Sequence, residues 1–197
     1  TLYTYFEPRG FDIENTYRVE FDYLTEKSPD YIANRTDEEA HADMRELLDR
    51  LRRRPGVEAV SMSQNSFPYN GSNSGMDVRL DTMESKYNIR RWVTPDFFRV
   101  FRYQGANGET PEQLAALLKE GTFMVSRNVF ESRYKIDLKD YVGKEFCLDQ
   151  DTAHLSKLVA ALQVVRYDDF SSGAYSRSAV ILLPENRLAS GNEICLR

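Results

Sequence analysis

Hydrophobic and polar residues alternate without interruption between residues 17 and 23. The aromatic and aliphatic positions share one side of an extended chain: Tyr17, Val19, Phe21 and Tyr23. A period of two predicts a β-strand, here with these four side chains buried and the charged ones between them facing water.

A period of 3.6 follows the next polar loop. Thr36 and Glu39 have the spacing of a capping box, which predicts the start of a helix that continues to about Arg54. One stripe of this helix is apolar and is expected to be buried: Ala40, Met44, Leu47, Leu48 and Leu51. His41 is expected on the solvent face. The arginines at 52–54 suit the negative end of the helix dipole, and an anion site is the alternative.

Pro55 and Gly56 end this helix, and residues 57–63 read as the next strand. The resulting strand–helix–strand unit favours a right-handed crossover within one sheet. The loop at 65–75 marks the expected start of a second part of the domain. Further strands are expected at 77–82, 85–93, 122–126, 142–148, 158–167, 178–183 and 193–196, and helical segments at 110–120 and 127–134. The strands 142–148 and 158–167 are expected to form a hairpin around the polar loop 149–156.

The stretch 91–101 is interpreted as an anchor between the two parts. Thr94 is the expected N-cap of a short helix, and Pro95 its first residue. Phe97, Phe98 and Phe101 then place aromatic rings against a core. Taken alone, the stretch is also compatible with an ordinary amphipathic turn. Gly143, the turn glycine that opens the strand 142–148, completes the set of expected structural anchors.

Composition narrows the class of protein. The 197 residues suffice for one large domain or two small ones. With 26 Lys and Arg against 31 Asp and Glu, the net charge of −5 argues against a sequence-independent nucleic-acid binder, which normally carries a basic patch. No apolar run is long enough to cross a membrane. The chain starts at Thr1 without a signal peptide, as an excised fragment does.

The residues that normally carry chemistry are few. His41 and His154 have no second ligand at metal spacing, so neither a metal nor a cofactor is expected. Cys147 and Cys195 fall in expected strands and read as small buried residues, with a disulfide as the alternative. The carboxylates at 149–151 and 168–169 read as solvated turns, because no calcium-loop series of ligands surrounds them. No nucleophile, phosphate or dinucleotide motif occurs. By exclusion, the residues favour a domain that binds or transmits over an enzyme.

The order of several motifs resembles a known family. Residues 55–61, PGVEAVS, resemble the segment after the first helix in the periplasmic core domain of MacB-like (FtsX-type) ABC transporter permeases. Residues 93–101, VTPDFFRVF, are similar to that family's V-(S/T)-P-D-(Y/F)-F-x-V-(L/F). Residues 123–130, 141–146 and 164–170 also resemble segments of the family, in the family's order. One departure is Gln163, where the family usually has glycine.

This resemblance implies an α+β fold in two parts. Residues 1–64 plus 176–197 would form a porter-like strand–helix–strand subdomain, and residues 65–175 a mostly β, sabre-like insertion. The chain would lie on the periplasmic (extracytoplasmic) face of the inner membrane, between the first two membrane helices of its parent. It would end before the last helix and strand of the family's first subdomain. Its expected partners are a second permease, a cytoplasmic ATPase whose motion it transmits, and a periplasmic adaptor protein.

Two alternatives from other classes remain open. An extracytoplasmic hydrolase would use His41 or His154 beside a serine or aspartate. A stand-alone secreted binding module for carbohydrate or peptide would display its tyrosines on one exposed face. Against the second, Tyr17 shares its expected strand face with Val19 and Phe21, which predicts a core position.

Overall fold

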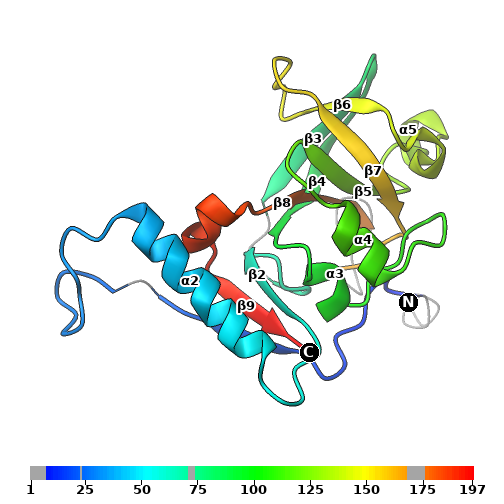
Figure 1. Ribbon diagram of the computed structural model, residues 1–197. Helices are drawn as coiled ribbons and strands as arrows, with labels where there is room; N and C mark the ends of the chain where they lie inside the picture. The colour runs from blue at the N-terminus through cyan, green and yellow to red at the C-terminus, as the bar shows by residue number, and fades with distance from the viewer. Residues whose placement is uncertain (1–7, 23, 71–73, 168–175) are drawn as a thin grey trace.

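The computed structural model describes residues 8–22, 24–70, 74–167 and 176–197. Its architecture is mixed: nine strands form one continuous sheet, with a few helices packed on it (Figure 1). The strands are β1 (Tyr17–Glu20), β2 (Val60–Gln64), β3 (Gly75–Leu80), β4 (Met83–Val93), β5 (Thr122–Ser126), β6 (Glu145–Leu148), β7 (Ser156–Leu162), β8 (Ser178–Leu182) and β9 (Glu193–Leu196).

The helices are mostly short. Among the described helices, only α2 has more than two full turns. The α-helices are α2 (Asp37–Arg52), α3 (Phe97–Val100), α4 (Pro111–Leu117) and α5 (Glu131–Tyr134), and the 3₁₀ helices are η1 (Leu138–Tyr141) and η3 (Glu185–Ser190). Capping boxes at Thr36–Glu39 and Thr110–Gln113 begin α2 and α4, so the expected starts of both helices are confirmed.

Six strands close into a ring. The order β4-β3-β6-β7-β5-β8 returns to β4, because β8 pairs with β4 in parallel over residues 89–93. We call this ring the barrel; its closure removes the free edges that an open sheet exposes. β5 is buried on both faces: Phe123 and Val125 join one hydrophobic core and Met124 another. A strand packed on both sides is expected to be apolar on both faces, and the three central residues of β5, Phe123 to Val125, are.

Three strands extend the sheet away from the barrel. β2 pairs with β4, β9 pairs with β2, and β1 pairs with β9, all antiparallel. We call β2, β9 and β1 the side sheet, and α2 lies across it (Figure 1). Leu48 of α2 packs there on Val60, Met62 and Ile194. The strand–helix–strand unit thus lies in one sheet, as expected, but β9 separates its two strands.

The expected burial of the first strand is wrong. Tyr17 is 65% exposed and Val19 is 46% exposed. Both lie opposite β9 residues, Leu196 and Ile194, whose side chains face α2. Residues opposite each other in an antiparallel pair share a face of the sheet. Tyr17 and Val19 therefore lie on the α2 face of the sheet, which is the side that was expected to be buried. The strand is at the edge of the sheet, however, and there the helix leaves these two side chains uncovered. Tyr23 lies outside the described residues.

Two expectations for α2 are also wrong. Leu47, placed in the apolar stripe, is 41% exposed, whereas Leu48 is buried. His41, expected in solvent, is buried, and its Nδ1 accepts a hydrogen bond of 2.9 Å from the backbone N–H of Ala189. The cause is η3, which packs against this side of the helix. Helical periodicity cannot reveal a 3₁₀ turn contributed by residues nearly 150 positions away.

The remaining expectations differ mainly at element ends. The β6–β7 hairpin is confirmed, although β7 stops at Leu162. β2 begins at Val60, α4 ends at Leu117, and only residues 131–134 of the expected helix at 127–134 are α-helical. Cys147 and Cys195 lie in β6 and β9 as expected, and both are buried free thiols rather than a disulfide. β8 pairs with β4 and β5; the expected division into residues 1–64 plus 176–197 and residues 65–175 stays a prediction.

The two histidines allow a matched test of this packing. We expect His41→Ala to lower the free energy of unfolding by about 1–2 kcal/mol, because it removes the acceptor for the Ala189 N–H and side-chain packing between α2 and η3. His154→Ala is the control: that side chain is 85% exposed and contacts Asp151 in the β6–β7 turn. Urea unfolding curves measure both. Equal effects of the two substitutions would contradict the buried position of His41.

Candidate functional site

The meeting of the barrel and the side sheet is the candidate site. We define the aromatic segment as residues 94–101, which follow β4 directly. Its first residue binds β2 by a reciprocal pair of hydrogen bonds: Thr94 N–H donates to the Met62 carbonyl at 2.9 Å, and Met62 N–H donates to Thr94 Oγ1 at 3.0 Å. The expected N-cap role of Thr94 is therefore wrong. α3 begins at Phe97, with Asp96 at its N-cap, so Pro95 is not its first residue either. The hydroxyl of Thr94 accepts from the buried amide of β2 instead.

The phenylalanines of this segment form the centre of the larger core. Phe97, Phe98 and Phe101 are fully buried. Ring centroids of Phe97 and Phe101 lie 4.8 Å apart, and Tyr103 lies 5.4 Å from Phe97. Aromatic pairs at such centroid distances add stability beyond the area that they bury. The segment is therefore held by packing on one side and by the β2 hydrogen bonds on the other.

Arg197 also stabilises the junction between the barrel and the side sheet. Arg197 is buried, and its Nε donates to the carbonyl of Val100 at 2.7 Å. Its Nη2 donates to the carbonyl of Asp12 at 3.0 Å, and the Asp12 carboxylate is 3.3 Å away. One guanidinium thus connects the end of β9, the aromatic segment and the lead-in to β1. Sequence reasoning missed Arg197, because a terminal arginine carries no periodic signal.

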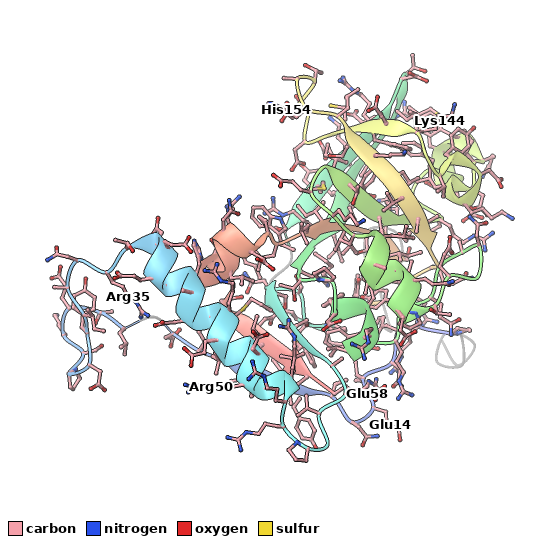
Figure 2. The ribbon with its side chains drawn as sticks, viewed as in Figure 1. Glu14, Arg35, Arg50, Glu58, Lys144 and His154 are labelled. Atoms are coloured by element: carbon pink, nitrogen blue, oxygen red, sulfur yellow. The ribbon has the colours of Figure 1, made fainter. Side chains whose placement is uncertain are left out.

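Charged side chains cross the junction at its surface. Arg52 of α2 lies 3.7 Å from Asp96, and Arg102 lies 3.6 Å from Glu58. Arg99 Nη2 also donates to the carbonyl of Glu58 at 3.2 Å. Figure 2 shows Glu58 near the C-terminal end of the chain, where its N–H donates to the carbonyl of Arg197. Exposed ion pairs of this kind each contribute about 0–1 kcal/mol, so they orient the two parts more than they hold them.

A cleft of about 620 Å³ opens beside these pairs, between α2, the aromatic segment and η3. Its charged lining residues are Arg45, Asp49, Arg52, Lys119, Glu120 and Glu185. The two signs are balanced, so the cleft selects neither anions nor cations by charge. Arg52 is paired with Asp49 at 2.9 Å as well as with Asp96, which favours the structural interpretation of the arginines at 52–54 over an anion site.

A buried carboxylate holds the side sheet together. Glu193 is fully buried, and its Oε2 accepts a hydrogen bond of 2.9 Å from Arg18 Nε of β1. Its Oε1 accepts hydrogen bonds from Ser63 Oγ and from the backbone N–H groups of Ser66 and Phe67. One side chain of β9 thus fixes β1, β2 and the turn after β2. A buried charge is tolerated where it is paired and fully hydrogen-bonded, as here.

The expected anchor residues do not all meet. Thr94, Pro95 and the three phenylalanines lie together at the junction, whereas Gly143 precedes β6 on the barrel. Gly143 has φ 93°, a left-handed conformation that favours glycine, and its N–H donates to the carbonyl of Leu158 at 2.7 Å. It therefore anchors the β6–β7 hairpin and not the junction.

The side chains that commonly act in catalysis or metal binding, His, Cys, Asp and Glu, are dispersed over the described part of the chain. In the described ranges no group of three or more His, Cys, Asp and Glu residues is placed to hold a metal ion. His154 lies at the far tip of the barrel, with Nδ1 3.1 Å from Asp151 (Figure 2). Burial, followed by the charge of Glu193, raises the pKa of the Cys195 thiol far above its ordinary value, so it stays protonated. Asp168 and Asp169 lie outside the described residues. No described helix is long and apolar enough to cross a membrane.

Comparison with known proteins gives structural likeness alone. No family model and no curated protein matches the sequence. The fold is similar to the extracellular domain of a noncanonical ABC-type transporter, YknZ, from Gram-positive bacteria: TM-score 0.45, 13% identity, covering 77% of this chain and 71% of that one. It is also similar to the periplasmic region of MacB from Actinobacillus actinomycetemcomitans: TM-score 0.48, 9% identity, covering 96% and 76%. Likeness at this level carries no argument about function, which has to come from this chain's own residues.

Glu193 provides a test of how the side sheet is held. We expect Glu193→Ala to cost about 3–5 kcal/mol, because it removes the acceptor of four hydrogen bonds and leaves Arg18 without its buried partner. The control is Glu20→Gln, which removes a β1 carboxylate that also pairs with Arg18 but is exposed; its expected cost is below about 1 kcal/mol. Thermal and urea unfolding measure both. A cost for Glu193→Ala no larger than that of the control would contradict this account.

Proposed function

We propose that this chain is the extracytoplasmic domain of an ABC transporter permease. In this proposal it has no catalysis of its own and transmits ATPase-driven motion for export or for lipoprotein or peptide handling. The observation that carries the proposal is spatial. Two of the motifs that carry the resemblance, PGVEAVS at 55–61 and VTPDFFRVF at 93–101, are separate in sequence and meet at the junction. There Glu58 contacts Arg99 and Arg102, and Met62, next after the first motif, binds Thr94.

The contacts support a mechanical role for this meeting point. A domain that transmits motion needs two parts that move as bodies and a connection that does not absorb the movement. The parts are the side sheet with α2 and η3, and the barrel with β8 included. We assign the connection to Thr94, Pro95 and the buried phenylalanines, and we assign to Gly143 the local task of shaping the barrel hairpin.

The proposed partners follow from this role. A second permease would stand beside the first, and a cytoplasmic ATPase would act through membrane segments of the parent. A periplasmic adaptor would meet the tip of the barrel, where the exposed β6–β7 turn carries His154. The cargo is not part of the proposal, because no described residue marks a binding preference for it.

The structure does not support the hydrolase alternative, because both histidines that could serve as its base make other contacts. His41 is buried and accepts a backbone hydrogen bond through Nδ1, and His154 pairs with Asp151 in an exposed turn. Neither makes a hydrogen bond to a serine side chain among those found in the described residues. The binding-module alternative was disfavoured because Tyr17 was expected to be buried. Tyr17 is exposed, so this objection no longer holds. The first experiment separates this alternative from the transporter.

That experiment examines the parent protein. We expect apolar spans of about 20 residues on both sides of this chain. We also expect a reporter enzyme that is active only outside the cytoplasm to work when fused after Arg197. The parent should co-purify with an ATPase subunit or carry its own ATPase domain. A parent with a cleaved leader and no membrane span would overturn the proposal and favour a secreted binding module.

A substitution at the junction tests the mechanical role itself. Thr94→Val keeps the shape of the side chain but removes the acceptor for the Met62 N–H, which leaves a buried donor unpaired. We expect a loss of about 1–3 kcal/mol in stability. In the parent transporter we expect transport to fall severalfold while ATP hydrolysis continues. Thr82→Val, in the exposed β3–β4 turn, is the control. Unchanged transport in a folded Thr94→Val protein would remove the coupling role.

A further inference from the structure

Within residues 8–22, 24–70, 74–167 and 176–197, the sheet has one open edge, which β1 forms. Every other described strand pairs with at least two strands, because the barrel is closed and the side sheet continues from β4. Among the described strands, β1 pairs only with β9. An edge strand offers unpaired backbone N–H and C=O groups, and proteins usually protect such an edge by covering it or by charging it.

This edge is uncovered on its α2 side. Tyr17 is 65% exposed there and Val19 is 46% exposed, as described above. Successive helix residues are rotated by about 100°, so Leu47 lies on one side of the buried Leu48 while Arg45 and Arg52 lie on the other. The two arginines line the cleft towards the barrel, so the exposed Leu47 lies on the side towards β1. The three apolar side chains form what we call the edge strip.

We infer that the edge strip binds a second copy of this chain by antiparallel pairing of β1 with β1. The reason is that the strand complements itself. Centred on Val19, such a pair sets Arg18 opposite Glu20 twice, and it brings Tyr17 opposite Phe21, the residue that follows β1 and packs against the core under α2, twice. Opposite charges and aromatic pairs across strands are both stabilising. The same alternation places the charges on one face and the apolar residues of both copies on the other.

The geometry leaves room for both copies of α2. Between the two β9 strands there would be three strand spacings, or about 14 Å. Helices pack at about 8–10 Å, so the two copies of α2 need not clash. The gap between them would lie above Tyr17, Val19 and Leu47, which would then be covered from both sides.

The strength of this contact is limited by its size. A stable interface buries about 1,200–2,000 Å², and a four-residue strand with one helix side chain provides less. We therefore expect a weak dimer whose population rises with protein concentration. Anchoring of two copies in one membrane assembly would raise their effective concentration. The inference uses only the edge strand, however, and holds whether or not the chain belongs to a transporter.

A cysteine at the centre of the pair tests its register. In Val19→Cys the two new thiols would face each other across the two-fold axis, so mild oxidation should give a covalent dimer. The native Cys147 and Cys195 are buried and do not compete. Tyr17→Cys is the matched control, because residue 17 faces residue 21 of the second copy and not itself. Cross-linking of both variants alike, or of neither, would overturn this pairing.

The charge pattern is tested without a cross-link. Glu20→Lys would set two cations opposite each other, the new ammonium group and Arg18 of the second copy. We therefore expect the dimer dissociation constant to rise about tenfold or more. Glu26→Lys changes the same charge at an exposed position after the strand and should leave the constant unchanged. Sedimentation velocity over a concentration series measures both, with circular dichroism to check folding. A chain that stays monomeric throughout, or a dimer indifferent to Glu20→Lys, would overturn the inference.

Discussion

The structure depends on β4, the strand that belongs to two assemblies at once. Its C-terminal half pairs with β8 to close the barrel, and its last residues pair with β2 to begin the side sheet. The chain then continues into the aromatic segment, which binds β2 through Thr94 and packs into the larger core through its phenylalanines. Because one strand serves both assemblies, a shift in its register would move every side chain to the opposite face in both. This explains the density of buried groups near its end, from Val93 through Phe101.

Local pattern predicted the elements well and their neighbours less well. The alternation that begins at Tyr17, the capping boxes and the apolar run at 122–126 are local signals, and the corresponding elements are present. Barrel closure is not local, because it needs β4 and β8 to pair across about 90 residues. The expectations for Tyr17 and His41 were wrong for the same reason. The burial of each side chain depends on which distant element covers that face of the strand or helix, and hydrophobic periodicity does not reveal the covering element. Glu193 was missed because a single carboxylate in a short strand looks like a solvated one.

The candidate site shows the same division. Thr94 and the phenylalanines were found because a threonine–proline pair before aromatic residues is a strong local pattern, yet the role expected for Thr94 was wrong. A helix cap is the usual partner of such a hydroxyl; here the hydroxyl accepts from an amide of β2, brought there by the fold. Arg197 acts in the same way from the end of the chain. The residues that join the two parts thus bind partners outside their own segment, which a local pattern does not reveal.

Stiffness at this junction decides what kind of movement the domain can make. β2 and β4 pair only through Trp92 and Val93, whereas β4 and β8 pair over five successive residues. Bending is therefore easier between β2 and β4 than within the barrel. Yet this short pairing is continued by the buried Thr94–Met62 bonds and by Arg197, whose loss would leave unsatisfied polar groups at about 1–3 kcal/mol each. The surface ion pairs around the cleft cost far less to break. Small displacements would thus open or close the cleft while the junction holds, as the proposed transmission of motion requires.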